Sequence, residues 1–171
     1  MRFSAVAICE ERIGDEDSII RVHHRAFPGL LEGRLVNELR QSRRLKVSFI
    51  ATSDDQIVGH VAFSPVTVGV SDRGVGLAPL AVLPEFQRQG IGAALVKHGI
   101  EECRQRGIGF VVVLGDPSFY RRFGFQPTSH WQLSDEYGGG EAFQALELQS
   151  GTVPKGGGLV RYAPEFSIFE S

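Results

Sequence analysis

The sequence predicts a mixed α/β fold built around one β-sheet. Apolar residues recur at helical spacing in two early segments and one central segment, and between them the apolar period changes to two, which is typical of strands. The apolar run Phe110–Leu114, which follows the central helix, is typical of a strand buried on both faces. The chain has 171 residues, the length of one domain, so we expect residues 1–171 to form a single domain.

Three segments have the apolar spacing of amphipathic helices. The first runs from Gly14 to Pro28, where aspartates favour the start of a helix and proline ends it. Leucines at every fourth position from Leu31 to Leu39 mark a second, shorter helix. The third runs from Ile91 to Arg106 and is followed by Gly107, a residue type that commonly ends helices.

Residues with the alternation or the apolar character of strands occupy much of the remaining chain. The predicted strands are Val47–Thr52, Ile57–Ser64, Thr67–Val70, Val75–Leu83, Phe110–Leu114, Phe143–Leu148 and Leu159–Ala163. Polar turns at 53–55 and 71–74 help to join the first four into a meander, and residues 117–123 form a short helical turn. Because the strand at 75–83, the helix and the strand at 110–114 form a βαβ unit, we expect these two strands to be parallel neighbours.

The charge balance, the apolar pattern and the cysteines exclude several classes of protein. The chain has 18 Lys and Arg against 20 Asp and Glu and a pI near 6.2, so neither nucleic acid nor an anionic membrane is an expected partner. No apolar stretch approaches the roughly 20 residues of a membrane-spanning helix. Residues Met1–Glu11 lack the apolar region of a signal peptide, which favours a cytoplasmic protein. Cys9 and Cys103 lie far apart without neighbouring ligand residues, so we expect two reduced core thiols and no metal site.

The most informative segment runs from Leu80 to Gly92, where an apolar strand passes through a polar loop into a helix. The first amides of a helix have no acceptor within it, and together with the helix dipole they attract negative charge. Here no carboxylate or hydroxyl group stands at the helix start to satisfy them, whereas Arg88 adds a positive charge. Gly90 and Gly92 leave the backbone open to close approach. The segment therefore predicts a site for a phosphate or pyrophosphate group.

Pro79, in the strand before this loop, predicts an interruption of strand pairing, because proline has no N–H. Such a break would leave the amides of residues 80 and 82 free for an extended ligand. The two glycines alone are also consistent with an ordinary turn. A dinucleotide-binding fold is disfavoured because the loop before Gly90 is too long and Leu95 stands where a third glycine is expected. A P-loop is excluded because the chain has no Gly-Lys-Ser/Thr sequence.

Two segments, Gln87–Gly92 and Gly115–Phe125, resemble the motifs of a known family. The first is similar to the Q/R-x-x-G-x-G/A segment with which the GCN5-related N-acetyltransferase (GNAT) superfamily binds the pyrophosphate of acetyl-CoA. The second is similar to that superfamily's second cofactor segment, which ends in Tyr-x-x-Phe-Gly-Phe. With Gly59–Val66 and Arg161–Pro164, the resemblance extends over nearly the whole chain to the YhbS-like branch of bacterial acetyltransferases. It implies a GNAT-like fold, a central mixed sheet with helices on both faces and a parallel pair splayed at the acetyl-CoA site.

The resemblance implies a role for each matching residue. The Leu80 amide would face the acetyl carbonyl, and Val82 would pair with the pantetheine arm, while the amides from Arg88 to Ala93 would hold the pyrophosphate. Tyr120 would stand beside the thioester sulfur as general acid for the departing thiolate, and packing among phenylalanines is its alternative role. The implied catalytic residues are Leu80 and Tyr120. The implied residues of the acetyl-CoA site, which contains no metal, are Leu80, Val82, Gln87, Arg88, Gln89, Gly90, Ile91, Gly92, Ala93, Asp116 and Tyr120.

The identity of the general base stays open. Some members of the superfamily use a glutamate on the strand before the pyrophosphate loop, but Val75–Leu83 contains no acidic residue. The candidates are Glu32, His60, His130 and ordered water, and each of the three side chains also has an ordinary structural interpretation. The His23-His24 doublet is typical of half-exposed histidines on a helix.

The sequence thus predicts an N-acetyltransferase that transfers an acetyl group directly from acetyl-CoA to a primary amine, in a small molecule or at a protein N-terminus or lysine. A non-catalytic acyl-CoA-binding or sensing module is the alternative, because the strand carboxylate is absent, and a nucleotide-binding domain is a third interpretation. By analogy of fold, Gly29–Arg44 and the loop Gly138–Gly140 border the acceptor side. No pattern identifies the acceptor, and a homodimer would be common among such enzymes.

Overall fold

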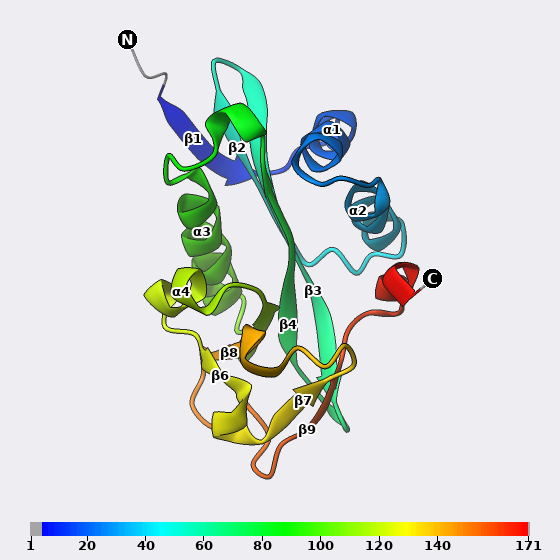
Figure 1. Ribbon diagram of the computed structural model, residues 1–171, viewed down its shortest axis with the longest axis vertical. Helices are drawn as coiled ribbons and strands as arrows, with labels where there is room; N and C mark the ends of the chain where they lie inside the picture. Colours follow the sequence, from blue (N-terminus) through cyan, green and yellow to red (C-terminus); the bar gives the residue numbers. More distant parts are fainter. Residues whose placement is uncertain (1–4, 171) are drawn as a thin grey trace.

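The computed structural model describes residues 5–170, and the strands among them form one mixed sheet (Figure 1). The strands are β1 (Val6–Glu10), β2 (Val47–Ser53), β3 (Gln56–Val68), β4 (Ser71–Val82), β5 (Phe110–Leu114), β6 (Gln126–Pro127), β7 (Leu133–Asp135), β8 (Phe143–Glu147) and β9 (Gly158–Arg161). Their order is β1-β2-β3-β4-β5-β8-β6, and β9 pairs with both β3 and β7. The expectation that residues 1–11 are not a signal peptide falls partly on residues 1–4, which lie outside the described part.

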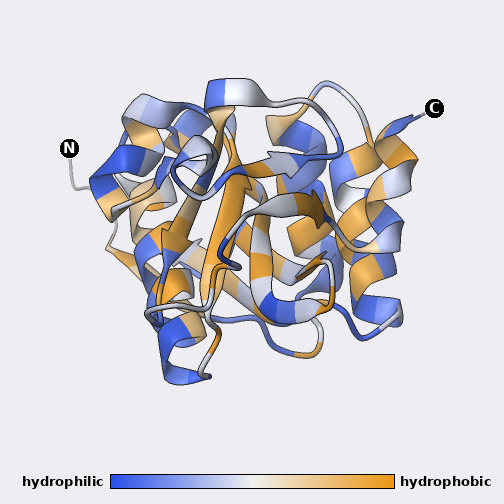
Figure 2. Cartoon of the chain, turned by 90° about the horizontal axis from the view of Figure 1, so that it is seen from below, coloured by the Kyte–Doolittle hydropathy of each residue, from blue (hydrophilic) through white to orange (hydrophobic). Residues whose placement is uncertain are grey.

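Helices cover both faces of the sheet. They are α1 (Glu16–Ala26), α2 (Leu31–Gln41), α3 (Ile91–Gln105) and the short α4 (Pro117–Tyr120). α3 and α4 lie on one side of the long strands, whereas α1, α2 and the C-terminal helical turn Pro164–Glu170 lie on the other (Figure 1). In Figure 2 the apolar strands run between these two groups of helices. The predicted α/β class with helices on both faces is confirmed, and no described helix is both long and apolar enough to span a membrane.

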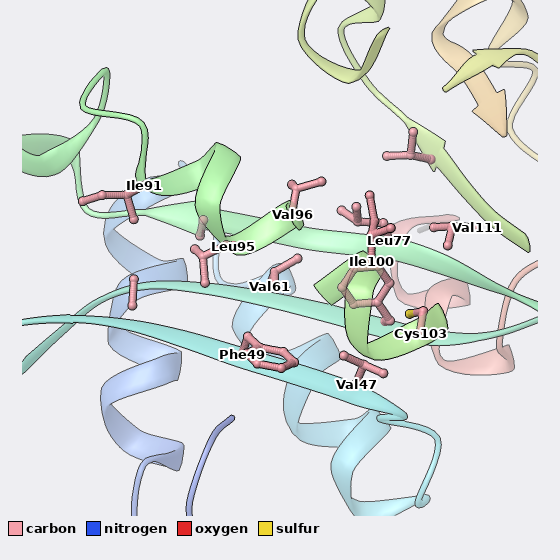
Figure 3. Close-up of a cluster of buried hydrophobic side chains, with 14 of the residues drawn as sticks. Val47, Phe49, Val61, Leu77, Ile91, Leu95, Val96, Ile100, Cys103 and Val111 are labelled. Atoms are coloured by element: carbon pink, nitrogen blue, oxygen red, sulfur yellow. The ribbon is translucent and has the colours of Figure 1, made fainter. Parts of the chain in front are cut away.

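The largest part of the core lies where α3 packs on the sheet (Figure 3). The α3 residues that face the sheet are Ile91, Leu95, Val96, Ile100 and Cys103. A Cβ on Gly99 would lie 2.3 Å from Cε2 of Phe63, so glycine lets the helix approach the strand closely. Cys103 is buried and Cys9 half-buried, and both are free thiols. Burial raises the pKa of Cys103 to about 12, which makes this thiol unreactive at neutral pH.

The hairpin between β3 and β4 differs from the prediction. The expected separate strand Thr67–Val70 and the expected turn at 71–74 are wrong, because β3 continues to Val68 and β4 begins at Ser71. Val68 pairs with Ser71, so the turn consists of two residues, and the first of them, Gly69, has a φ of 58°. The polar residues at 71–73 that suggest a turn instead form the solvent-facing end of a long strand.

Strands β1, β6 and β7 have no counterpart in the sequence prediction. β1 is an edge strand whose residues are exposed or half-buried. Its sequence, Val-Ala-Ile-Cys-Glu, does not alternate between apolar and polar residues, so it carries no strand signal. β6 has two residues and β7 has three, which is too short to show a period. The remaining helices and strands lie within a few residues of their predicted bounds.

β4 and β5 are parallel neighbours, as predicted, but they pair only over a short stretch. The paired residues run from Gly74 with Phe110 to Gly76 with Val112. After this point no further pair joins the two strands in the described structure. The strands therefore splay at their C-terminal ends, and we call the space between these unpaired ends the β4–β5 opening.

β4 is also irregular on its other side, toward β3. The register shifts between the pair Val61–Leu80 and the pair Phe63–Leu77. Residues 78 and 79 consequently have no β3 partner in the described register, so the interruption of pairing predicted at Pro79 is confirmed. The irregular part of β4 lies beside the β4–β5 opening.

Candidate functional site

A cleft of about 730 Å³ lies between the start of α3, α4 and the unpaired ends of β4 and β5. The residues of the predicted site that line it are Leu80, Val82, Gln87, Arg88, Gly90, Ile91, Gly92, Ala93, Asp116 and Tyr120. Gln89 does not line it, and its side-chain amide donates to the carbonyl of Glu85 at 3.4 Å. The site prediction did not include four further lining residues, Phe86, Gly115, Phe119 and Arg122. The fold thus brings the two motifs together around one cleft.

The first turn of α3 presents amides without acceptors to the cleft. Gly90 is the N-cap residue with a φ of 84°, and no side chain caps the helix. The amide of Ala94 donates to the carbonyl of Gly90 at 3.1 Å, so Ile91, Gly92 and Ala93 have no acceptor within the helix. A Cβ at Gly90 would meet nothing within 4 Å, and one at Gly92 would meet its nearest atoms at 3.9 Å. This combination of open space and free donors suits a pyrophosphate.

Two arginines add positive charge to the same cleft. Arg88 precedes α3 in a left-handed conformation with a φ of 63°. The guanidinium of Arg122 lies 4.7 Å from the centre of the Phe119 ring, and its Nε donates to the Phe119 carbonyl at 3.3 Å. Neighbouring Arg121 does not line the cleft, and nothing in the sequence distinguishes the two arginines. Arg122 could therefore be found only from the structure.

The side chains of Gln87 and Asp116 hold the backbone at the edges of the cleft. Gln87 Nε2 donates to the carbonyl of Val82 at 2.9 Å, which ties the loop to the end of β4. Asp116 is the N-cap residue of α4, and its Oδ1 accepts from the amide of Ser118 at 2.9 Å and from its hydroxyl at 2.8 Å. These bonds lower the pKa of Asp116, so the carboxylate is charged at neutral pH. Both side chains already have partners, and they shape the loops that carry the free amides.

Tyr120 is buried in the wall of the cleft among aromatic side chains. Its ring lies edge-on to Phe119 at 4.8 Å and to Phe125 at 5.6 Å between centres. Burial raises the pKa of Tyr120 to about 12, so the phenol keeps its proton at neutral pH. Within the described structure its hydroxyl has no hydrogen-bond partner. Tyr120 therefore packs in the core with a protonated hydroxyl and also lines the cleft.

None of the predicted base candidates lines the cleft. His130 is exposed and lies against the ring of Trp131, 4.8 Å away between centres. Glu32 lies in the first turn of α2, where Oε2 is buried without a partner in the described structure. His60 is completely buried. Asp116 is the one carboxylate, and no histidine is present, among the lining residues.

His60 belongs to a buried polar chain that passes between α1 and the sheet. Its Nδ1 lies 2.8 Å from Nε2 of His23, and its Nε2 lies 2.8 Å from Oγ of Ser48. The prediction of a half-exposed doublet is wrong for His23, because α1 buries it on the face of Ile19, whereas His24 is exposed. Burial lowers the pKa of both members of the pair, that of His23 to about 3.

Comparison with known proteins places this fold and cleft in a family. Residues 17–125 match the model of the acetyltransferase (GNAT) family. The chain is 39% identical over 156 residues to YhbS of Escherichia coli (strain K12), described as an uncharacterized N-acetyltransferase, and the match covers 90% of this chain and 92% of YhbS. It is 40% identical over 120 residues to YjhQ of the same strain, also described as an uncharacterized N-acetyltransferase, over 67% of this chain and 66% of YjhQ.

Two crystal structures are similar over nearly the whole chain. The structure of Escherichia coli YhbS in complex with CoA superposes with a TM-score of 0.90 at 36% identity, and covers 98% of this chain and 94% of that one. A GNAT family acetyltransferase from Brucella melitensis in complex with acetyl-CoA superposes with a TM-score of 0.82 at 34% identity, and covers 95% of this chain and 99% of that one. The family model and the relatives agree with the splayed strands and the glycine-rich start of α3, and the chain belongs to the GNAT family of N-acetyltransferases.

Proposed function

We propose that this chain binds acetyl-CoA in the cleft and transfers the acetyl group directly to a primary amine in a ternary complex. The observation that carries the proposal is the cleft itself, because it joins the uncapped start of α3 to the buried phenol of Tyr120 beside the β4–β5 opening. The complexes of the two relatives with CoA and acetyl-CoA support the same ligand for this chain.

The residues of the cleft fit acetyl-CoA, which supplies an activated acetyl thioester. The amides of Ile91, Gly92 and Ala93 and the guanidinium groups of Arg88 and Arg122 would hold the pyrophosphate. The open space at the two glycines of this turn leaves room for the phosphates. The backbone at residues 80 and 82, which lies beyond the last pair between β4 and β5, would pair with the pantetheine arm.

The transfer forms a bond from the amine nitrogen to the carbonyl carbon and breaks the bond from that carbon to sulfur. The Leu80 amide would donate to the carbonyl oxygen, where negative charge first develops. The Tyr120 hydroxyl would give its proton to the departing thiolate and regain one from water. The proton that the amine loses would pass to ordered water, because the lining residues contain no histidine and no carboxylate other than Asp116, which caps α4.

The missing side-chain base supports a second candidate, a non-catalytic acyl-CoA-binding or sensing module. One pair of measurements separates the two. Calorimetric titration with acetyl-CoA tests the cleft, and thiol release over a panel of amines tests transfer. Saturable binding with turnover of any amine supports the enzyme, and binding without turnover favours the sensor. A protein that shows no saturable binding at millimolar acetyl-CoA would contradict both.

A further inference from the structure

A second cavity, of about 220 Å³, has an almost wholly apolar lining. From the sheet it is lined by Leu77, Ala78 and Leu114. Its other wall consists of four aromatic residues, Tyr137, Tyr162, Phe166 and Phe169. We call this cavity the aromatic pocket. Phe166 packs with Leu35 and Leu39 of α2, so the pocket lies on the α2 side of the sheet, opposite α3 and α4 (Figure 1).

The aromatic pocket and the cleft proposed for acetyl-CoA are both lined by residues of β4 and by residues at the end of β5. On β4, Ala78 lines the pocket and Leu80 lines the cleft. Leu114, the last residue of β5, lines the pocket, and Gly115, which follows it, lines the cleft. All four positions follow the last pair that joins β4 to β5, so they flank the β4–β5 opening. A nucleophile held in the pocket would therefore reach a thioester held in the cleft through this opening.

The aromatic wall is a continuous row of rings. The ring centres of Tyr137 and Tyr162 are 5.9 Å apart, those of Tyr162 and Phe166 are 5.0 Å apart, and those of Phe166 and Phe169 are 6.3 Å apart. The hydroxyl of Tyr137 donates to the carbonyl of Phe166 at 3.4 Å, which joins the loop after β7 to the C-terminal turn. Ring faces of this kind bind apolar groups and also attract cations.

The rim of the pocket exposes apolar surface to water. Leu114 is 39% exposed, Tyr137 38% and Phe169 39%, although they come from three different segments of the chain. Exposed apolar side chains are ordinary when scattered, but a group of them around one concave site marks a ligand surface. Burial of their outer faces by an apolar ligand would be favourable.

The charge around the pocket favours a cation. None of its lining residues is charged. Burial, followed by the carboxylates of Glu136, Glu170 and Asp135, raises the pKa of Tyr137, so these carboxylates lie near the aromatic wall. One of them, Glu136, is paired with Arg161 at 3.7 Å. A primary amine enters as an ammonium ion at neutral pH and would be attracted by both the rings and these carboxylates.

We propose that the aromatic pocket is the acceptor site and that the acceptor is a small primary amine whose nitrogen lies close to an aromatic or branched aliphatic group. The inference rests on the proposed function and specifies its substrate class. A cavity of about 220 Å³ equals about seven times the volume of a water molecule in the liquid, which suits one ring or a short branched chain. The ammonium ion first gives one proton to ordered water, and the neutral amine then attacks in the transfer step described above.

The test compares acceptors of matched charge in thiol release from acetyl-CoA. Phenethylamine and isoamylamine are compared with ethanolamine, spermidine, a lysine peptide and a peptide with an N-terminal phenylalanine. We expect kcat/KM for the two apolar amines to exceed that for ethanolamine by about tenfold or more. We also expect saturable calorimetric binding of phenethylamine to the protein in the presence of CoA, which reports on the pocket without turnover.

A matched pair of leucine variants tests whether the preference for apolar amines comes from the aromatic pocket. Leu114→Ser removes an exposed pocket residue, and Leu159→Ser removes a leucine of nearly equal exposure, 38%, that does not line the pocket. Phe169→Ser is a second pocket variant at an exposed position. We expect both pocket variants to lose about tenfold in kcat/KM for phenethylamine with unchanged affinity for acetyl-CoA, and Leu159→Ser to keep both.

The outcomes separate the inference from the proposed function. Equal or better turnover of ethanolamine, spermidine or either peptide overturns the inference and leaves the acetyltransferase assignment standing. Absence of phenethylamine binding, or equal losses in Leu114→Ser and Leu159→Ser, also overturns it. Failure of acetyl-CoA to bind at all overturns the proposed function, and the inference with it.

Discussion

A Cβ on Gly115 would lie 2.5 Å from Cε2 of the Tyr120 ring, so the position of this ring depends on the absence of a side chain at residue 115. Gly115 directly follows β5, and both residues line the cleft. The residue that follows the central strand thereby sets the place of the proposed proton donor. This relationship allows the role of the phenol to be tested without removing it.

We expect Gly115→Ala to lower kcat by about tenfold, because the ring must move away from its place beside the opening. Overpacking should also lower the free energy of unfolding by about 1–3 kcal/mol. Gly29→Ala is the matched control, since a Cβ at Gly29 would meet nothing within 4 Å. Steady-state kinetics and urea unfolding measure the two effects. Full activity in Gly115→Ala would argue against a positioned phenol.

Tyr120→Phe should keep the fold, because the ring retains its contacts with the aromatic side chains around it, and should lose only the hydroxyl. If that hydroxyl protonates the thiolate, kcat falls about tenfold, or about 1.4 kcal/mol in barrier, with little change in acetyl-CoA affinity. Because the pKa of Tyr120 is raised to about 12, the wild-type rate should not fall through loss of this proton below about pH 10. Equal kcat values for the two proteins would remove Tyr120 from the chemistry.

A third prediction concerns the start of α3. Gly92→Glu places a carboxylate among the free amides, where it would occupy the proposed phosphate site, and acetyl-CoA binding should be abolished. The helix itself should not lose stability, because a negative charge in the first turn is favourable. Gly92→Ala is the control and should bind acetyl-CoA with nearly wild-type affinity, since its Cβ makes only ordinary contacts at 3.9 Å. Calorimetric titration and thermal unfolding of both variants check this, and retained binding in Gly92→Glu would place the phosphates elsewhere.

The cleft could be predicted from the sequence because its residues come from two continuous segments. The sequence around Gly90 combines a strand end, an uncapped helix start and a cation, and all three are local features. Two of the lining residues that it missed, Phe119 and Arg122, have neighbours of similar character in the sequence. Only the three-dimensional fold decides which of these neighbours faces the cleft.

The aromatic pocket could not be predicted, because it is assembled from distant parts of the chain. Leu114 ends the central strand, Tyr137 lies in a loop and Phe169 lies in the C-terminal turn. Each alone is an unremarkable apolar residue, and no period connects them. The burial of His23 had a clearer signal, since it lies four positions after Ile19 on the apolar face of α1, but histidine is usually expected at the polar edge of such a face.

The buried pair of His23 and His60 predicts a pH-dependent stability. Burial lowers the folded-state pKa of both, that of His23 to about 3, whereas in the unfolded chain each titrates near 6.5. As the pH falls below about 6.5, the unfolded state takes up protons that the folded state cannot. The free energy of unfolding should therefore be fully retained above this pH and decrease below it, toward the folded-state pKa, by up to about 1.4 kcal/mol per pH unit for each histidine.

The slope of the free energy of unfolding against pH tests this pair. The slope can be compared between variants even if a substitution changes the free energy of unfolding at every pH. Urea unfolding between pH 7.5 and pH 5 should give a shallower slope for His23→Gln, because one group that titrates only in the unfolded chain is lost. His24→Gln, at the exposed neighbouring position of α1, is the matched control for the substitution itself. If the slope is the same in the wild type and in His23→Gln, then His23 is protonated in the folded protein and its burial beside His60 must be relieved by a rearrangement of α1.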